Sequence, residues 1–225
     1  MTTKQAVIIG AGAGLSASLA RKLSARGLGL TLAARDTSDL GPLAEETGAR
    51  TIAMDGSDPA AMAALFADLA GPLAVAIYNP SARQRGPLVD LDPETVRRAV
   101  EVTAFGAFLM GQQAARLMLG NDGPHRGTIL FTGASAGVKG FPLSAPFAMG
   151  KFAQRGLAQS MARELHPRGI HVAWVNIDGQ ISNIREDSPD TLNPDAIAEA
   201  YMALMDQPIS AWSEELSLRP MNEKF

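Results

Sequence analysis

The sequence predicts an α/β protein built on a doubly wound, seven-stranded parallel sheet with helices on both faces. Apolar runs rich in β-branched residues alternate with amphipathic stretches along the chain, which is typical of such a sheet. A glycine-rich turn follows the first apolar run and precedes a helical pattern. The 225 residues are 46% hydrophobic and no linker-like stretch divides them, so we expect a single domain over residues 1–225.

The expected elements follow from these runs in chain order. The first run, residues 6–9, leads through the glycine turn into a helix over 14–25. Later runs bounded by turn formers predict strands at 29–34, 50–54, 73–78, 128–132, 170–176 and 215–218. The stretches between them predict helices over 59–69, 93–119, 144–164 and 194–205. Asp92-Pro93 and Asn193-Pro194 mark two helix starts, because a capping side chain precedes a proline that has no N–H to satisfy.

The glycine turn predicts a nucleotide site. Glycine lets the backbone approach a pyrophosphate closely, and the first N–H groups of the following helix face the anion. An ordinary strand-to-helix turn would have a similar composition, but its place directly after an apolar strand favours the Rossmann arrangement, with the ligand at the carboxyl ends of the strands. The residues expected at the phosphates are Gly10, Gly12, Gly14, Leu15 and Ser16.

Composition argues against several classes of partner. The net charge of −3 and the scattered Lys and Arg residues offer no basic surface for nucleic acid. Cysteine is absent and His125, His166 and His171 are not in ligand spacing, so we expect no metal site. No leader pattern and no apolar run of membrane length is seen, so we expect a soluble, cytoplasmic protein with a small-molecule substrate.

Several motifs together identify a family. In a phosphate turn of the form T-G-x-x-x-G-x-G, the fixed positions hold Ile9, Gly10, Gly14 and Ser16. The stretch 78–81, Tyr-Asn-Pro-Ser, stands where an N-N-A-G motif follows the fourth strand, and it keeps Asn79. Lys151 matches the lysine of a Y-x-x-x-K motif. In these features and in their order, the chain resembles the short-chain dehydrogenase/reductases over nearly its whole length.

The resemblance implies roles for further residues. It implies that Asp55 holds the adenine, although an exposed turn aspartate is an equally good interpretation of this residue alone. It also implies that Lys151 binds the nicotinamide ribose and that Gly179 and Ile181 lie beside the nicotinamide. Relatives pair their two long helices into homodimers and homotetramers, so we expect one of these assemblies here.

The cofactor choice depends on the end of the second strand. An acid there would pair with a free ribose 2′-hydroxyl, but the corresponding position holds Ala34 and the next holds Arg35. A guanidinium can bind a 2′-phosphate with two hydrogen bonds, so we expect NADP. Two alternatives remain open: Arg35 pairs with Asp36 on the surface, or Asp36 faces the ribose and NAD binds instead.

The resemblance breaks at the catalytic positions. The family uses an Asn-Ser-Tyr-Lys set, in which the tyrosine protonates the substrate oxygen. Here Thr103, Ala134 and Phe147 stand at the first three positions and Lys151 alone is kept. Loss of a general acid lowers a rate by roughly 10²–10⁴.

Other side chains are candidates for the missing acid. They are Ser135, Thr132, Tyr78 and Asp178. A partly buried Asp178 would have a raised pKa and donate a proton, whereas a strand-end aspartate that caps its own turn is the simpler interpretation. The catalytic set that we predict is Lys151, Ser135, Asp178 and Thr103.

The sequence therefore predicts an NADP(H)-dependent oxidoreductase with a non-standard proton donor, acting on an unidentified carbonyl or conjugated compound. A nucleotide-binding protein without redox turnover and a non-redox lyase on the same fold are the alternatives. Arg83 and Arg85 follow the fourth strand, where they could meet an anionic substrate, although a solvated loop is the simpler interpretation.

Overall fold

Seven parallel strands form one sheet in the order β3-β2-β1-β4-β5-β6-β7 in the computed structural model, which describes residues 2–224. The strands are β1 (Gln5–Ile9), β2 (Gly29–Ala34), β3 (Arg50–Ala53), β4 (Leu73–Tyr78), β5 (Gly127–Thr132), β6 (Ile170–Ile177) and β7 (Glu215–Leu218). The fold class and the seven expected strands are confirmed, with bounds that differ by at most one residue.

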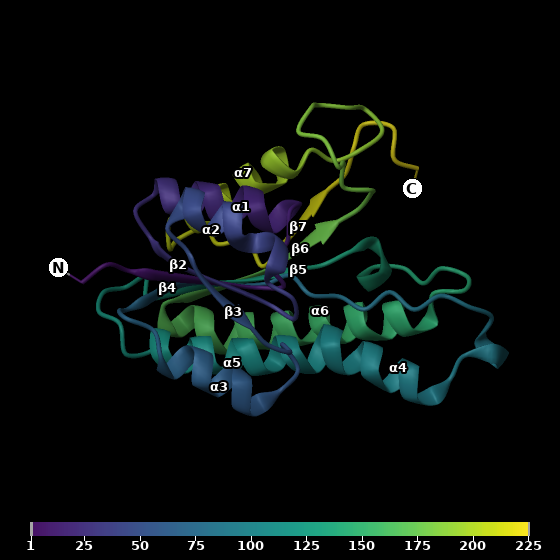
Figure 1. Cartoon of the computed structure of the whole chain (residues 1–225), viewed down its shortest axis with the longest axis horizontal. Coiled ribbons are helices and arrows are strands. Elements are labelled where there is room, and N and C mark those ends of the chain that lie inside the picture. The colour runs from purple at the N-terminus through teal and green to yellow at the C-terminus, as the bar shows by residue number, and fades with distance from the viewer. Residues whose placement is uncertain (1, 225) are drawn as a thin grey trace.

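Helices cover both faces of the sheet (Figure 1). One face carries α1 (Leu15–Ala25), α2 (Gly41–Thr47) and α7 (Pro194–Met205). The other carries α3 (Pro59–Ala67), α4 (Pro93–Val100), α5 (Gly106–Met118) and α6 (Ala145–Leu165). Two apolar clusters match these layers, one between the sheet and α3, α5 and α6, the other between the sheet and α1, α2 and α7. Among residues 2–224, no helix has both the length and the apolarity needed to cross a bilayer.

Two expectations about helices were wrong. The helix expected over 93–119 is divided by a π-helical turn, Glu101–Phe105, between α4 and α5. The short helix α2 was not expected, because its Gly-Pro start and single buried apolar side chain, Leu43, leave almost no periodic pattern. The caps expected at Asp92 and Asn193 are present, since Asp92 accepts a hydrogen bond from the Thr95 N–H and Asn193 accepts one from the Asp195 N–H.

The sheet reverses its strand order at β1, which lies between β2 and β4. The chain after β1 and the chain after β4 therefore leave the same edge in different directions and open a crevice between them. The Asn79 N–H donates to the Ile9 carbonyl at 3.0 Å, so the two chain segments stay joined just beyond their strands.

Candidate functional site

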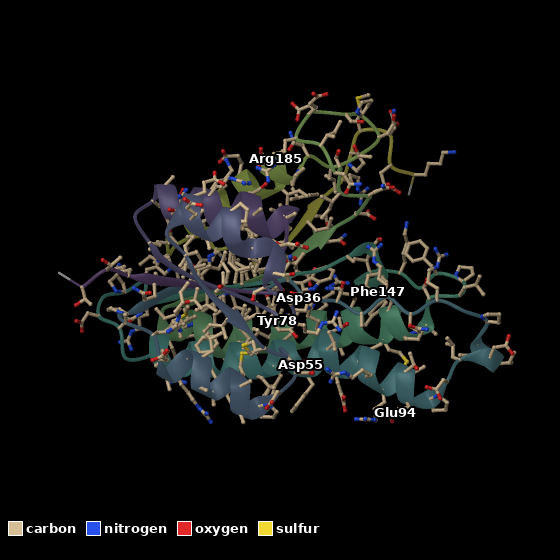
Figure 2. The ribbon with its side chains drawn as sticks, in the orientation of Figure 1. Asp36, Asp55, Tyr78, Glu94, Phe147 and Arg185 are labelled. Carbon is tan, nitrogen blue, oxygen red and sulfur yellow. The ribbon has the colours of Figure 1, made fainter. Side chains whose placement is uncertain are left out.

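Two cavities border the carboxyl ends of the strands, and Ser81 lines both of them. The first has a volume of about 500 Å³ and lies beyond β1, β2 and β3; the second, of about 690 Å³, lies beyond β4, β5 and β6. Asp36 and Asp55 line the first and Phe147 the second (Figure 2). A further cavity of about 520 Å³ opens at the amino ends of the strands, remote from the glycine turn.

The cavities bring together most of the predicted site residues. Gly10, Arg35 and Asp55 line the first. The second is lined by Asn79, Ser135, Lys151, Asp178, Gly179 and Ile181. Gly12, Gly14, Leu15 and Ser16 form the turn and the first turn of α1, whereas Thr103 is buried behind the site.

Gly10 is required by the geometry of the turn. Its φ of +81° lies in the left-handed region, and a Cβ there would stand 2.8 Å from the ring of Pro80. Gly12 and Gly14 have open space around them instead. No side chain caps α1 and no acid lies in its first turn, so its own side chains do not neutralise the positive end of this helix. The turn thus leaves room for an anion close to the backbone.

Ser16 does not point at the opening. Its buried hydroxyl donates to the Gly10 carbonyl at 2.9 Å and accepts a hydrogen bond from Asn79 Nδ2 at 2.7 Å. The side chain we expected to meet a phosphate therefore fixes the shape of the glycine turn and joins it to the segment after β4.

Arg35 and Asp36 follow β2 at the rim of the first cavity, and both side chains are exposed. The Asp36 carboxylate accepts the Ser38 N–H at 2.9 Å, and hydrogen bonds from Ser38 hold its pKa below the usual range. Among residues 2–224, no ion pair or hydrogen bond joins Arg35 to Asp36, so the surface-pair alternative has no contact to support it.

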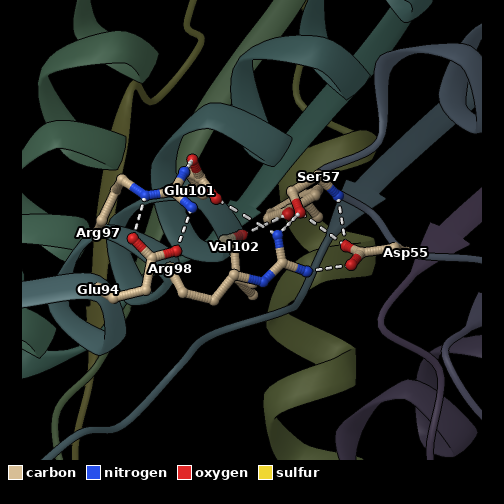
Figure 3. Close-up of polar contacts among 8 residues, drawn as sticks. Asp55, Ser57, Glu94, Arg97, Arg98, Glu101 and Val102 are labelled. Carbon is tan, nitrogen blue, oxygen red and sulfur yellow. Dashed lines mark hydrogen bonds and ion pairs between the residues drawn. The ribbon is translucent and has the colours of Figure 1, made fainter.

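Asp55 is held in a polar chain that ends on α4 (Figure 3). Its carboxylate accepts hydrogen bonds from the Ser57 N–H and hydroxyl, at 2.9 and 2.7 Å, and from Arg98. Burial raises its pKa, but the Ser57 hydrogen bonds and the charge of Arg98 outweigh that effect and lower it. Arg98 also reaches Glu101 at the start of the π-helical turn, so α4 and the end of β3 are held together.

Lys151 is buried in α6 with its ammonium toward the second cavity. Nζ donates to the Thr132 carbonyl at 2.6 Å and to Gln154 Oε1 at 3.3 Å, which leaves one N–H of its three. Burial, with a smaller contribution from the charge of Arg83, lowers its pKa to about 7. A lysine whose pKa is lowered this far would exchange a proton near neutral pH, unlike an unperturbed lysine.

Thr103 supports the site from behind. It lies in the π-helical turn, where its Oγ1 accepts the Ala82 N–H at 3.1 Å and its carbonyl accepts Gln154 Nε2 at 3.2 Å. A Cβ on Gly150 would stand 2.7 Å from Thr103 Cβ, so α6 approaches closely here. Thr103 thus positions Lys151 through Gln154 and does not face the cavity itself.

Phe147 and Ala134 pack on each other in a small apolar cluster at the second cavity. The guanidinium carbon of Arg83 lies 4.9 Å from the centroid of the Phe147 ring. Ser135 is half-buried at the cavity wall and begins a 3₁₀ turn, Ser135–Gly137. Sequence reasoning missed two contacts of this site. The contact of Arg83 with the Phe147 ring depends on how a loop folds back onto α6. The hydrogen bond from Lys151 to Gln154 lies in a stretch that reads as an ordinary helix.

Three of the expected substitutes for the acid are engaged elsewhere. The hydroxyl of the buried Tyr78 donates to the Val102 carbonyl at 2.5 Å, and burial raises its pKa. The Thr132 hydroxyl is paired with Tyr201 at 2.8 Å. Asp178 forms an ion pair with Arg219 at 2.8 Å, so its carboxylate is already engaged.

Gly179 and Ile181 form the wall beyond β6. The φ of Gly179 is +150°, and a Cβ there would stand 2.7 Å from Pro220. Ile181 forms a parallel bridge with Leu192, which closes the loop between β6 and α7 at its base. Glu223 and Lys224 also line the second cavity, so the segment after β7 contributes to this wall.

Comparisons with known proteins agree with this arrangement. A family model described as short chain dehydrogenase matches residues 4–191. An L-2,3-butanediol dehydrogenase of Corynebacterium glutamicum is 29% identical over 209 residues, covering 81% of this chain and 78% of that protein. A short-chain dehydrogenase from Rhodopseudomonas palustris is 36% identical, with a TM-score of 0.84 over 96% of this chain and 98% of that one. A metagenomic short-chain oxidoreductase, solved in complex with NADP, is 26% identical, with a TM-score of 0.83 over 97% and 98%.

Proposed function

The chain belongs to the short-chain dehydrogenase family, and on that premise we propose that it is an NADP(H)-dependent oxidoreductase acting on a small carbonyl or conjugated compound. The observation that carries the proposal is the pair of cavities that meet at Ser81, the first bordered by the glycine turn and the second by Lys151. Support for the cofactor also comes from the 26% identical oxidoreductase that was solved with NADP.

The residues of the first cavity fit a dinucleotide. The open space around Gly12 and Gly14, and the uncapped start of α1, suit a pyrophosphate at Gly10, Gly12, Gly14 and Leu15. Arg35, at the rim, would hold the 2′-phosphate with its planar fork of N–H groups. Asp55 would accept from the adenine amino group while it keeps its bonds to Ser57 and Arg98. Ser16 and Asn79 would keep the turn in shape.

The second cavity would hold the nicotinamide end and the substrate. NADP(H), when bound, supplies the hydride. Lys151 would bind the nicotinamide ribose through its remaining N–H until that proton is donated, and Gly179 and Ile181 would form the wall beside the ring. Because Phe147 has no proton to donate, we assign the donation to Lys151, whose lowered pKa suits proton transfer near pH 7, with Ser135 positioning the substrate oxygen. Asp178 stays a weaker candidate because of its pairing with Arg219.

The test is turnover with and without the Lys151 ammonium. NADPH consumption is followed with a panel of ketones and diketones, for the wild type and for Lys151→Met. We expect the variant to lose roughly 10²-fold or more in rate. Turnover by the wild type that Lys151→Met leaves unchanged would contradict the assignment, and NADPH binding without turnover on any carbonyl would favour a protein that binds the nucleotide without redox chemistry.

We also propose that the chain assembles as a homodimer or homotetramer. Phe105, Phe108, Met149 and Phe152 are exposed apolar side chains on the π-helical turn, α5 and α6. In relatives this is the side through which two copies pack, and large exposed apolar surfaces are typical of such contacts. Light scattering on the wild type and on Phe108→Glu tests this: we expect an oligomer that the variant dissociates, whereas a monomeric wild type would contradict it. A single domain over the whole chain and a cytoplasmic location stay predictions.

A further inference from the structure

The second cavity is lined by more basic than acidic side chains. Arg83, Lys139, Lys151 and Lys224 line it, against two carboxylates, Asp178 and Glu223. The charge of Asp178 is already balanced by Arg219 at 2.8 Å. A cavity lined mainly by one sign of charge concentrates ligands of the opposite sign.

We propose that the substrate carries an anionic oxygen group, a carboxylate or a phosphate, and that Arg83 binds this group and sets the specificity of the enzyme. This rests on the proposed function, since it names the class of substrate for the same site. The inference follows from where Arg83 lies and from what holds it there.

Arg83 is placed by the Phe147 ring. Its guanidinium carbon lies 4.9 Å from the ring centroid, within the range of a cation–π contact. A guanidinium held over a ring face keeps N–H donors at its edge, and these can make a bidentate contact with a carboxylate or phosphate. Among residues 2–224, Arg83 has no carboxylate partner that would occupy this edge.

The position of Phe147 places the Arg83 contact next to the expected site of reaction. The family resemblance puts the catalytic tyrosine at this position, four residues before Lys151. The ring therefore borders the space where a reacting oxygen would lie, and Arg83 adds a cation beside that space. An anionic group one or two carbons from the carbonyl would be held there with the carbonyl facing Ser135 and Lys151.

The positive charges of Arg83 and Lys151, which both line this cavity, repel each other. The charge of Arg83 contributes to the lowered pKa of the buried Lys151. An anion bound between them would relieve this repulsion and raise the fraction of Lys151 that carries the proton. Anion binding and proton supply would then be coupled through the same pair of side chains.

Lys139 extends the basic wall. Its Nζ lies 5.4 Å from the centroid of the Phe141 ring, so a second cation is held over an aromatic face in the same cavity. Arg85, two residues beyond Arg83, is exposed and does not line the cavity. It is a matched control, with the same charge and the same loop but without the Phe147 contact.

The experiment compares probes that differ mainly in charge. Acetoacetate is paired with its methyl ester, and dihydroxyacetone phosphate with dihydroxyacetone, which separates carboxylate from phosphate. Binding is measured for the wild type, Arg83→Gln, Arg83→Lys and Arg85→Gln, by the fluorescence of bound NADPH and by thermal shift in the free protein. Thermal unfolding of each variant shows that it has folded.

We expect at least one anionic probe to bind about tenfold more tightly than its neutral partner, an advantage that weakens as salt is added. Arg83→Gln should remove most of this preference, Arg83→Lys part of it, and Arg85→Gln none. Equal binding of the charged and neutral probes to the wild type, or a preference that survives in Arg83→Gln, would overturn the proposal. Failure to bind NADPH would instead overturn the proposed function. The two failures can be distinguished, because the anion preference is also measured by thermal shift in the protein without NADPH.

Discussion

Ser16 and Asn79 join the two chain segments that leave the sheet at its switch point. Asn79 Nδ2 donates to Ser16 Oγ at 2.7 Å, and Ser16 donates in turn to the Gly10 carbonyl at 2.9 Å. The family motif has glycine at position 16, so this chain supports its phosphate turn with a side chain. The turn is therefore held by a short polar chain that a single substitution can break.

Replacing Ser16 with alanine should lower the free energy of unfolding by about 1–2 kcal/mol. The half-buried Asn79 amide would lose its 2.7 Å acceptor, and the Gly10 carbonyl would keep only a long hydrogen bond from Asn79 Nδ2 at 3.4 Å. Ser18 is the matched control: it is equally buried in α1, but its hydroxyl has no partner among the described residues. Ser18→Ala should leave stability unchanged or raise it. Urea unfolding of both variants measures the difference, and equal losses would show that the Ser16 contacts contribute nothing.

Alanine substitutions at Gly10 and Gly12 in the glycine turn should differ in their effect on stability. Gly10→Ala places a Cβ 2.8 Å from Pro80 at a φ of +81°, so it should cost about 1 kcal/mol or more in stability and weaken NADPH binding. Gly12→Ala adds its methyl group to open space and should unfold at nearly the wild-type temperature. Thermal unfolding compares the two. A Gly10→Ala protein as stable as Gly12→Ala would mean that the Pro80 contact relaxes freely.

Lys151 should make the stability of the protein depend on pH. Burial lowers its pKa to about 7, whereas in the unfolded chain it titrates near 10.5. Between these values the unfolded chain binds more protons, so the free energy of unfolding rises with pH from 7 upward, by up to roughly 1.4 kcal/mol per pH unit. Below pH 7 both states carry the charge and the cost of burying it is greatest.

Lys151→Met isolates this effect, because methionine has no proton to exchange. The stability of the wild type relative to the variant should increase steadily between pH 7 and 10, as measured by denaturant unfolding at each pH. Two parallel stability curves would show that Lys151 is not titrating near neutral pH in the folded protein.

Phe147 and Ala134 allow a test of the missing acid. Both line the second cavity, so Phe147→Tyr with Ala134→Ser would restore a phenol and a hydroxyl at the positions where the family has them. We expect the double variant to gain roughly 10²-fold on simple ketones, the low end of a general-acid contribution. Phe147→Tyr keeps an aromatic ring under Arg83, so the anion site should persist. No gain would mean that the cavity has been rebuilt around a different proton path.

Much of the fold could be predicted because buried parallel strands leave apolar runs, and because Asp92-Pro93 and Asn193-Pro194 place two helix starts. The π-helical turn could not be predicted, since Glu101–Phe105 has the composition of an ordinary helix. The turn is distinguished by its tertiary contacts. The Tyr78 hydroxyl donates to the Val102 carbonyl within the turn, and a Cβ on Gly106 would clash with that hydroxyl.

The candidate site also has residues that the sequence predicted and contacts that it did not. The glycine turn was predicted as a site from its residues, and Asp55 and Lys151 from the family resemblance; the structure gathers them at one edge of the sheet. For Arg83 the sequence favoured a solvated loop over contact with an anionic substrate, because it does not show that this loop folds back onto Phe147. Contacts between a loop and a distant helix depend on packing that no local pattern records.

The measurement that tests this account most directly is a fluorescence titration of the protein with NADPH and with NADH, repeated for Arg35→Ala. We predict that NADPH binds more tightly than NADH, and that Arg35→Ala loses about tenfold in NADPH affinity while NADH binding changes little. Tighter binding of NADH would contradict the role of Arg35. Failure of both nucleotides to bind would contradict the oxidoreductase itself.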